Sequence, residues 1–146
     1  MRRPSEGHLV ANAQWAKIAA SDMEPNRRRG GDLRTMLSPA TVKSTSGFMG
    51  VLTLQPGECV TEHYHPYSEE FIYLVSGQLL IRLDGEPVPL GAGEGLFIPI
   101  GVRHRLEHSE AGQPAFAVFH LGPLAPRPDL GHVDTEPAPA ASGELR

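Results

Sequence analysis

Cysteine is nearly absent from this chain. Only Cys59 is present, so the chain cannot close a disulfide on itself, which fits a reducing compartment. No apolar run approaches the roughly 20 residues that a membrane-spanning helix needs. Positive charge is not in excess either, because 13 Lys and Arg residues face 17 Asp and Glu residues, for a net charge of −4. We therefore expect a cytoplasmic protein without a nucleic-acid or membrane partner.

Aromatic residues are also sparse, at 6%, whereas glycine and proline are abundant, with 16 and 14 copies. Turn residues separate about eight to ten short apolar or alternating segments, a pattern that predicts an all-β sandwich or barrel. Asp84-Gly85 predicts a hairpin turn between two of them. The segments are residues 32–39, 47–54, 59–65, 70–76, 78–84, 88–90, 96–99, 103–108 and 115–121.

Two histidines one residue apart lead the candidate functional residues. Side chains alternate between the faces of a strand, so His63 and His65 point the same way. Residues 66–68 (PYS) can turn the chain back, which would place Glu70 on an adjacent strand. His104, in a second stretch rich in glycine and proline, supplies a third imidazole. These four side chains form a candidate divalent-metal site with a position left open for water or substrate, as in catalytic sites.

Two further histidines are candidates for the same interior. In residues 103–108 (RHRLEH), strict alternation places His108 on the face of His104, and a packed core histidine is the alternative. His120 lies in the apolar segment 115–121. It reaches the metal region only if that segment pairs with residues 103–108 in a register that sets His120 opposite His104. Its alternative is again a core histidine.

The segments at the two ends differ in composition from the middle of the chain. Residues 1–30 are expected to form an N-terminal arm that ends near a basic run, residues 27–31 (RRRGG). We interpret this run as a solvated loop, with the anchoring of an anionic ligand group as the alternative. Residues 131–146 are expected to be a partly disordered tail, because their end lacks apolar side chains to bury. Residues 31–130 between them are expected to form one domain.

The two histidine stretches resemble the paired motifs of the cupin superfamily. The first motif is matched by Gly57, His63, His65, Glu70 and Gly77 at the family spacing, and the second by Gly93, Pro99, Gly101 and His104. His108 stands where the second motif usually has Asn. The resemblance implies a double-stranded β-helix, or jelly roll, with an N-terminal arm. Jelly rolls must protect their sheet edges, so we also expect a homodimer that pairs through an edge strand.

A finer likeness covers most of residues 27–136. Residues 29–34 (RGGDLR), 46–52 (SGFMGVL), 62–71 (EHYHPYSEEF) and 123–136 (PLAPRPDLGHVDTE) resemble the single-domain cupin polyketide cyclases of bacterial aromatic-polyketide clusters, including the resistomycin-type cyclases. The resemblance implies a zinc-bearing enzyme, with Fe2+, Mn2+ and Ni2+ as other possible metals. Its substrate would be a poly-β-ketone, delivered by a polyketide synthase complex and closed by an intramolecular aldol reaction.

The roles of individual residues follow from that resemblance. His63, His65, Glu70 and His104 would hold the metal, and His120 or His108 would be the general base. Two alternatives use the same ligands. One is an iron-dependent cupin dioxygenase or oxygenase, and the other is a non-catalytic cupin in which the metal holds a small ligand.

Overall fold

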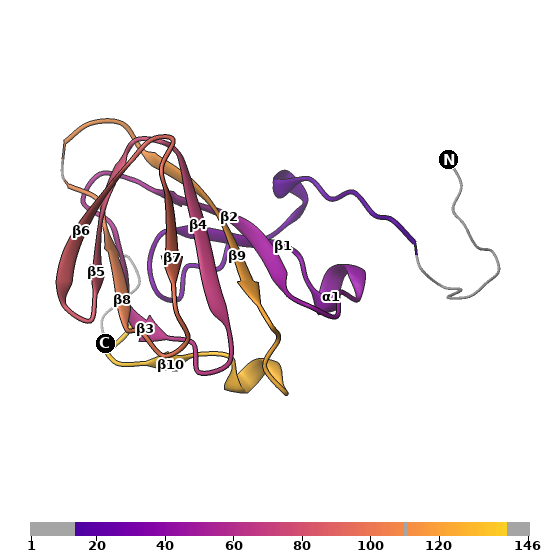
Figure 1. Ribbon diagram of the computed structural model, residues 1–146. Helices are drawn as coiled ribbons and strands as arrows, with labels where there is room; N and C mark the ends of the chain where they lie inside the picture. The colour runs from indigo at the N-terminus through magenta and orange to yellow at the C-terminus, as the bar shows by residue number, and fades with distance from the viewer. Residues whose placement is uncertain (1–13, 110, 140–146) are drawn as a thin grey trace.

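The computed structural model consists of two antiparallel five-stranded sheets that pack face to face (Figure 1). It describes residues 14–109 and 111–139. One sheet has the strand order β1-β2-β9-β4-β7, and the other has the order β10-β3-β8-β5-β6. The strands are β1 (Asp32–Leu37), β2 (Phe48–Leu54), β3 (Cys59–Tyr64), β4 (Glu69–Ser76), β5 (Gln78–Leu83), β6 (Glu86–Gly91), β7 (Gly95–Ile98), β8 (His104–Glu107), β9 (Ala115–Gly122) and β10 (Val133–Asp134). The predicted all-β jelly-roll sandwich is confirmed.

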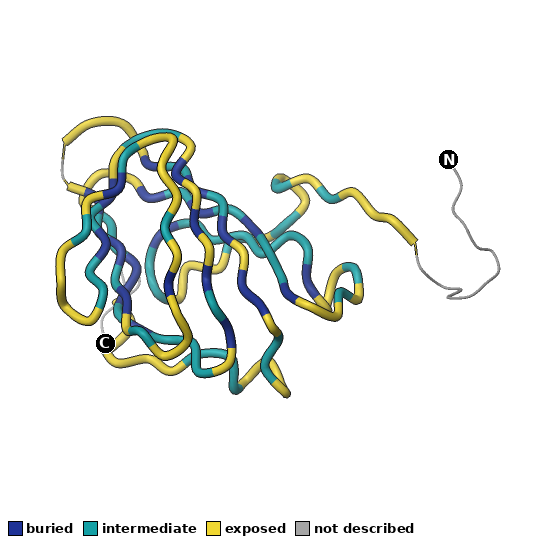
Figure 2. The backbone as a smooth tube through the Cα atoms, in the orientation of Figure 1, coloured by how far each residue is buried: buried dark blue, intermediate teal, exposed yellow. Residues whose placement is uncertain are grey.

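Alternation along the strands explains why each sheet turns one face inward. On β4, Glu70, Ile72 and Leu74 are buried, whereas Phe71 and Tyr73 between them are exposed. Figure 2 shows buried segments recurring along the strands of both sheets. Each fully buried leucine or isoleucine contributes roughly 1.5–3 kcal/mol to stability. The buried apolar residues are Leu52, Leu54, Val60, Ile72, Leu74, Leu79, Ile81, Leu90, Ile98, Leu106, Ala115, Ala117, Phe119 and Leu121.

The predicted Asp-Gly hairpin joins β5 to β6. Asp84 and Gly85 have φ angles of 50° and 87°, as a two-residue type I′ turn requires. Leu83 pairs with Glu86 directly across the turn, so the two strands continue in register from it. This element is confirmed because its signal is local.

Two pairings expected from the sequence are wrong, because most consecutive strands of this sandwich lie in different sheets. β3 and β4 are such a pair, so residues 66–68 carry the chain across the sandwich and do not close a hairpin. β8 pairs with β3 and β5, whereas β9 pairs with β2 and β4. His120 therefore lies opposite Met49 and Phe71, not opposite His104. The apolar pattern of a strand predicts which of its faces is buried, but it does not predict which strand pairs with it.

Short helical segments and loops flank the sandwich. They are the 3-10 helices η1 (Ala20–Asp22) and η2 (Pro128–Leu130) and one α-helical turn, α1 (Pro39–Val42), which Ser38 caps by accepting a hydrogen bond from the Thr41 amide. The first described residues of the N-terminal arm extend away from the sheets (Figure 1), whereas Asn26 forms a bridge with Leu33 of β1 and Arg29 accepts a hydrogen bond from the Thr61 amide of β3. Residues 1–13 of the expected arm and 140–146 of the expected tail lie outside the described residues. β10 falls within the expected tail and pairs with β3.

None of the helices in the described ranges has the length and apolar character needed to cross a membrane.

Candidate metal centre

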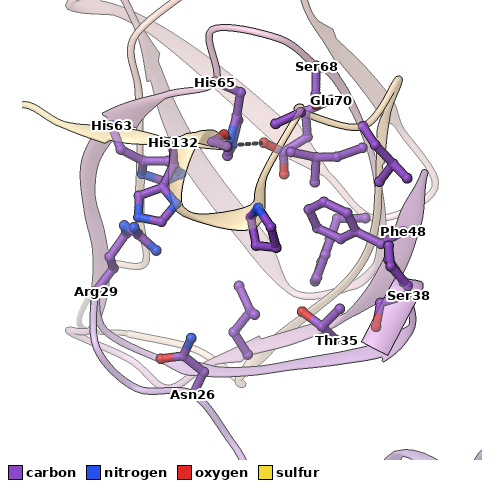
Figure 3. Close-up of a pocket in the computed structure, with 18 of the residues that line it drawn as sticks. Asn26, Arg29, Thr35, Ser38, Phe48, His63, His65, Ser68, Glu70 and His132 are labelled. Atoms are coloured by element: carbon purple, nitrogen blue, oxygen red, sulfur yellow. Dashed lines mark hydrogen bonds and ion pairs between the residues drawn. The ribbon is translucent and has the colours of Figure 1, made fainter. Parts of the chain in front are cut away.

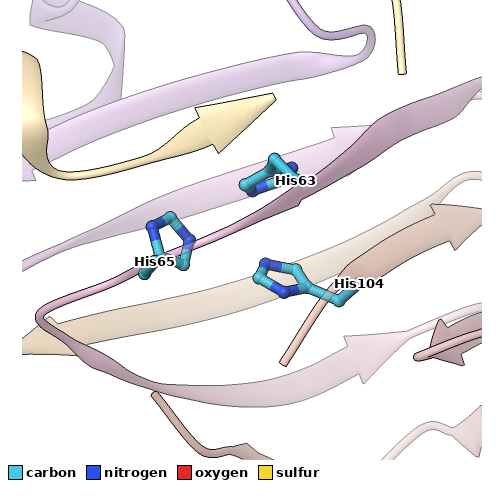
Figure 4. A group of neighbouring side chains, drawn as sticks. All are labelled: His63, His65 and His104. Atoms are coloured by element: carbon cyan, nitrogen blue, oxygen red, sulfur yellow. The ribbon is translucent and has the colours of Figure 1, made fainter. Parts of the chain in front are cut away.

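Three histidines predicted to share a site lie together at one end of the sandwich (Figure 4). His63 on β3 and His104 on β8 are directly opposite each other in the ladder. His65 follows the end of β3, two residues after His63 and on the same side. One ring nitrogen from each of the three lies within 4.8 Å of the others. Strand alternation and strand register together thus build the cluster.

Each of the three imidazoles is held through its Nδ1 atom by a backbone carbonyl. The Nδ1-to-oxygen distances are 2.8 Å from His63 to Thr61, 2.9 Å from His65 to Gly131 and 3.0 Å from His104 to Val102. A carbonyl oxygen only accepts hydrogen bonds, so each Nδ1 carries the hydrogen. The Nε2 atoms are thereby left as the coordinating nitrogens, an arrangement common around metal-binding histidines.

Glu70 reaches the cluster from the opposite sheet, and this arrangement differs from the adjacent strand that the sequence suggested. It is the second residue of β4 and points inward with Ile72 and Leu74. Its Oε1 atom lies 3.3 Å from Nε2 of His65 and 3.1 Å from Nε2 of His104. The site therefore spans the two sheets, with imidazoles from one and a carboxylate from the other.

The electrostatics of the cluster follow from burial and from these contacts. Burial and the neighbouring His104 lower the pKa of His63 to about 3, so this ring is neutral at physiological pH. Burial opposes ionisation of Glu70, but its contacts with His104 and His65 outweigh that effect and lower its pKa. The same contact raises the pKa of His104 against the effect of burial. An ionised carboxylate thus compensates positive charge in this interior.

The residues present fit a divalent metal. Nε2 of His104 and Oε1 of Glu70 are buried, and neither has a hydrogen-bond partner of acceptable geometry among the described residues. The 3.1 Å between these two atoms is therefore an electrostatic contact without hydrogen-bond geometry. Buried polar atoms are rarely left unpaired, and a cation coordinated by imidazole nitrogens and a carboxylate oxygen would use both. Histidine and carboxylate ligands suit zinc and several other transition metals.

The two histidines predicted as general bases lie away from this cluster. His108 is buried, as the alternation through His104 and Leu106 predicted, although β8 itself ends at Glu107. Its ring nitrogens lie 2.7 Å and 2.6 Å from the carbonyl oxygens of Ser109 and Gln113. His120 is exposed on the outer face of β9, since its neighbours in the strand take the inward positions. Its ring stacks at 5.8 Å from that of Phe71.

A cavity of about 620 Å³ opens beside the cluster (Figure 3). His63, His65 and Glu70 contribute to its wall. Most of the remaining lining is apolar, and segments 26–40, which includes β1, and 124–132 supply much of it. Its apolar residues include Leu33, Phe48, Phe119, Leu121 and Leu124, and its polar residues include Asn26, Arg29, Thr35, Ser38, Ser68 and His132. The space suits an apolar small molecule with a few polar groups.

Two of these cavity residues were not predicted as site residues. Arg29 lies in the basic run that the sequence favoured as a solvated loop. His132 lies in the proline-rich tail, where no periodicity signals a direction. Burial lowers the pKa of His132, with a further contribution from the positive charge of Arg29. In the sequence these residues lie far from the basic run 27–31, so no local pattern signals that the two segments meet.

Comparison with known proteins places these features in a family. The cupin domain family matches residues 50–120. The chain is 57% identical over 129 residues to the polyketide synthase CurC of Streptomyces cyaneus, covering 88% of this chain and 82% of that protein. It is 53% identical over 127 residues to the tetracenomycin polyketide synthase protein TcmJ of Streptomyces glaucescens, covering 87% and 85%.

A solved structure shares the fold at low sequence identity. The polyketide cyclase RemF from Streptomyces resistomycificus superposes with a TM-score of 0.65 at 18% identity. The superposition covers 84% of this chain and 86% of that one. The likeness supports the jelly-roll architecture described above.

Proposed function

The chain belongs to the cupin family, with CurC and TcmJ among its relatives, and from that premise we propose that it is a metal-dependent polyketide cyclase. Its reaction is a regiospecific intramolecular aldol cyclisation and aromatisation of a poly-β-ketone chain. The observation that carries the proposal is a cluster of three imidazoles and a carboxylate that borders an apolar cavity of about 620 Å³. The names of two relatives and one structural neighbour, which refer to polyketide synthases and a polyketide cyclase, support the substrate class.

The proposed ligands are His63, His65, His104 and Glu70, and zinc is the proposed metal. A divalent cation in this position would supply Lewis-acid stabilisation of negative charge on ketone oxygens. The ligands' own contribution is rigidity, because every Nδ1 atom is bonded to a backbone carbonyl. Groups held in this way need little rearrangement during the reaction.

The cavity walls are proposed to select one fold of a flexible substrate. A poly-β-ketone has many conformers, and aldol closure needs one methylene carbon close to one ketone carbon of the same chain. Apolar side chains such as Phe48, Phe119 and Leu124 exclude water and confine the chain. Confinement of this kind removes a large entropic part of the barrier.

The proton of the reacting methylene group needs an acceptor near the cavity. The positions of His108 and His120 do not favour them for this role, because neither lines the cavity. His132 lines it beside His63 and Arg29 (Figure 3). Its pKa is lowered by burial, so its neutral ring can accept a proton at physiological pH. We assign the proton transfer to His132, with loss of water then giving the aromatic ring.

The remaining parts of the proposal concern the protein's surroundings. We propose that the substrate comes from a polyketide synthase, in keeping with the names of the relatives. A two-fold homodimer is proposed because exposed aromatic side chains gather on β4 and β7. A cytoplasmic location is proposed from the single thiol, Cys59.

Substitution of one ligand tests the proposal directly. His65→Ala should lose bound metal and cyclisation together, whereas His120→Ala should keep its metal, because His120 lies on the outer face. Elemental analysis of protein purified without added metal gives the metal content, and mass spectrometry of a synthetic poly-β-ketone thioester gives ring closure by loss of water.

Three results would contradict the proposal in different ways. Ring closure by the metal-free His65→Ala protein would leave the metal a structural role only. Oxygen consumption that depends on iron would identify an oxygenase. Binding of the poly-β-ketone without turnover by fully loaded protein would identify a binding protein.

A further inference from the structure

Two arginines share one carboxylate at the edge of the cavity. Asp134 on β10 accepts a hydrogen bond from Nε of Arg29 at 2.7 Å and from Nη2 of Arg28 at 2.9 Å. The arginines come from the loop before β1, more than 100 residues away in the sequence. The contact with Arg29 and Arg28 lowers the pKa of Asp134 despite its partial burial, so the carboxylate is ionised. It joins the loop to the outermost strand of the other sheet.

The two arginines differ in where their guanidinium groups lie. The side chain of Arg28 is 55% exposed and is not part of the cavity lining, whereas that of Arg29 is 18% exposed and lines the cavity. Figure 3 shows Arg29 on the same side of the cavity as His63 and His132. Asp134 fixes Nε of Arg29 and therefore the direction of the planar group.

Both terminal nitrogens of Arg29 are left over, because Asp134 accepts a hydrogen bond from Nε alone. Nη2 is buried, and no described residue accepts a hydrogen bond from it. A buried guanidinium nitrogen without an acceptor is rare in folded proteins, because desolvation of a charged donor is costly.

The charge of the cluster also favours an anion. Asp134 divides its single negative charge between Arg29 and Arg28, so the charge of Arg29 at this wall of the cavity is only partly compensated. The other ionisable contributors nearby are His132, whose lowered pKa keeps it neutral, and Glu70 beside the histidine cluster. The apolar lining around them reduces screening by water, so an anionic group that reaches the Arg29 guanidinium meets a partly compensated cation.

We propose that Arg29 is the anchor for a carboxylate on an otherwise apolar, polyketide-like ligand. This inference rests on the proposed function for its ligand class and adds a specificity-determining residue to it. Arg29 binds the carboxylate through the terminal nitrogens of its guanidinium group while Asp134 holds Nε, so the free acid of a polyketide chain binds better than its ester. The carboxylate end of the ligand is thereby fixed at the wall of the cavity that carries His63 and His132.

A matched pair of probes tests the anchor: 2-naphthoic acid and its uncharged methyl ester, titrated calorimetrically into metal-loaded protein. Wild-type protein should bind the acid at least about 10-fold more tightly than the ester, since hydrogen bonds between charged groups are the stronger ones. Arg29→Gln should reduce the ratio to within about 2-fold. Arg28→Gln is the control, because it removes the same charge from the same carboxylate outside the cavity and should keep the preference.

Asp134→Asn keeps the test decisive if Arg29→Gln fails to fold. This variant removes the neutralising carboxylate and leaves Arg29 in place, so the preference for the acid should persist or rise. A fall to parity in Asp134→Asn, or an unchanged ratio in folded Arg29→Gln with unchanged metal content, would overturn the anchor. If Arg29 had only a structural role, Arg29→Gln would lower the thermal midpoint of unfolding and leave the ratio of the affinities for acid and ester unchanged.

The same proteins separate the anchor from the cyclase proposal. Retained preference for the acid together with no cyclisation of the poly-β-ketone would contradict the cyclase and leave the anchor standing. Cyclisation of the poly-β-ketone, together with a preference for the acid that is unchanged in Arg29→Gln, would contradict the anchor and leave the cyclase standing.

Discussion

Gly30 marks the closest approach of the N-terminal loop to the sheet that carries His63. Its φ angle is +110°, and a Cβ atom built on it would overlap the carbonyl oxygen of Cys59 on β3. Its neighbour Arg29 accepts a hydrogen bond from the Thr61 amide through its backbone oxygen, at 2.9 Å. The absence of a side chain at Gly30 thus lets the loop lie against β3 and positions Arg29 at the cavity.

Replacement of this glycine should be costly. Gly30→Ala is expected to lower the free energy of unfolding by about 2–4 kcal/mol, because both backbone strain and steric overlap apply. Gly93→Ala is the control, since Gly93 has a φ of +87° but open space around its Cα, and should cost only about 1 kcal/mol. Urea denaturation of both variants measures the difference. An equal loss of unfolding free energy in the two variants would show that the loop shifts at little cost to accommodate a side chain at Gly30.

At the scale of single elements, the sequence predicted local structure correctly but did not predict which strands pair with each other. The His-x-His spacing placed two imidazoles on one face, and the register of β3 with β8 added His104 to them. The Asp84-Gly85 turn was predictable because its backbone conformation depends on two residues. The neighbours of β4 and β9 were not, because their apolar faces fit several strands equally well. The prediction for His120 depended on such a pairing and therefore did not hold.

The tail that follows β10 is fastened to the sheet by Thr135, whose amide and hydroxyl donate hydrogen bonds to Glu62, and by the carboxylate of Glu136. Glu136 accepts hydrogen bonds from the backbone amide of Glu62 at 2.7 Å and from Nε of Arg105 at 3.0 Å. Burial is the largest single effect and would raise the pKa of Glu136, but its contacts with Arg105 and with the Glu62 amide together outweigh burial, and its pKa is lowered. The folded protein therefore favours the ionised form more than the unfolded chain does.

Because of this contact, the free energy of unfolding should depend on pH. Because the folded pKa lies below the unfolded value of 4.5, the contribution of Glu136 is present above pH 4.5 and is lost as the pH falls through the folded value. Glu136→Gln should cost about 1 kcal/mol at neutral pH and progressively less in acid. Urea unfolding across that pH range measures this, with Asp129→Asn, in the exposed pair with Arg127, as a control expected to show no loss. A difference that grows on acidification would contradict the assignment.

For the molecule as a whole, exposed apolar side chains gather on the outer face of one sheet. Phe71, Tyr73 and Val75 on β4 and Phe97 on β7 are about half exposed. The rings of Phe71 and Phe97 lie 5.2 Å apart, so the exposed residues form a continuous group. Apolar groups of this kind mark contact surfaces between proteins. A second copy of the chain would bury the same group on both partners.

Light scattering tests the proposed homodimer. Wild-type protein at micromolar concentration should have twice the mass of one chain, and Phe71→Glu combined with Phe97→Glu should shift it toward a monomer, because burial of two charges opposes association. Val133→Glu is the control, since Val133 is exposed on β10 of the other sheet. A monomeric wild-type protein, or a double variant that remains dimeric, would contradict this interface.

The cavity combines the histidine and carboxylate cluster with walls that come largely from loops and from β1, the outermost strand of its sheet. His63, His65 and Glu70 belong to β3, to the residue just beyond it and to β4, whereas segments 26–40 and 124–132 supply much of the remaining lining. Within these segments, residues 26–31, 38–40 and 124–132 lie outside the strands, so substitutions there can reshape the cavity while both sheets keep their registers. The shape of the cavity can therefore change without disturbing the packed core, and chimeras that exchange only these loops are the natural starting point for redesign.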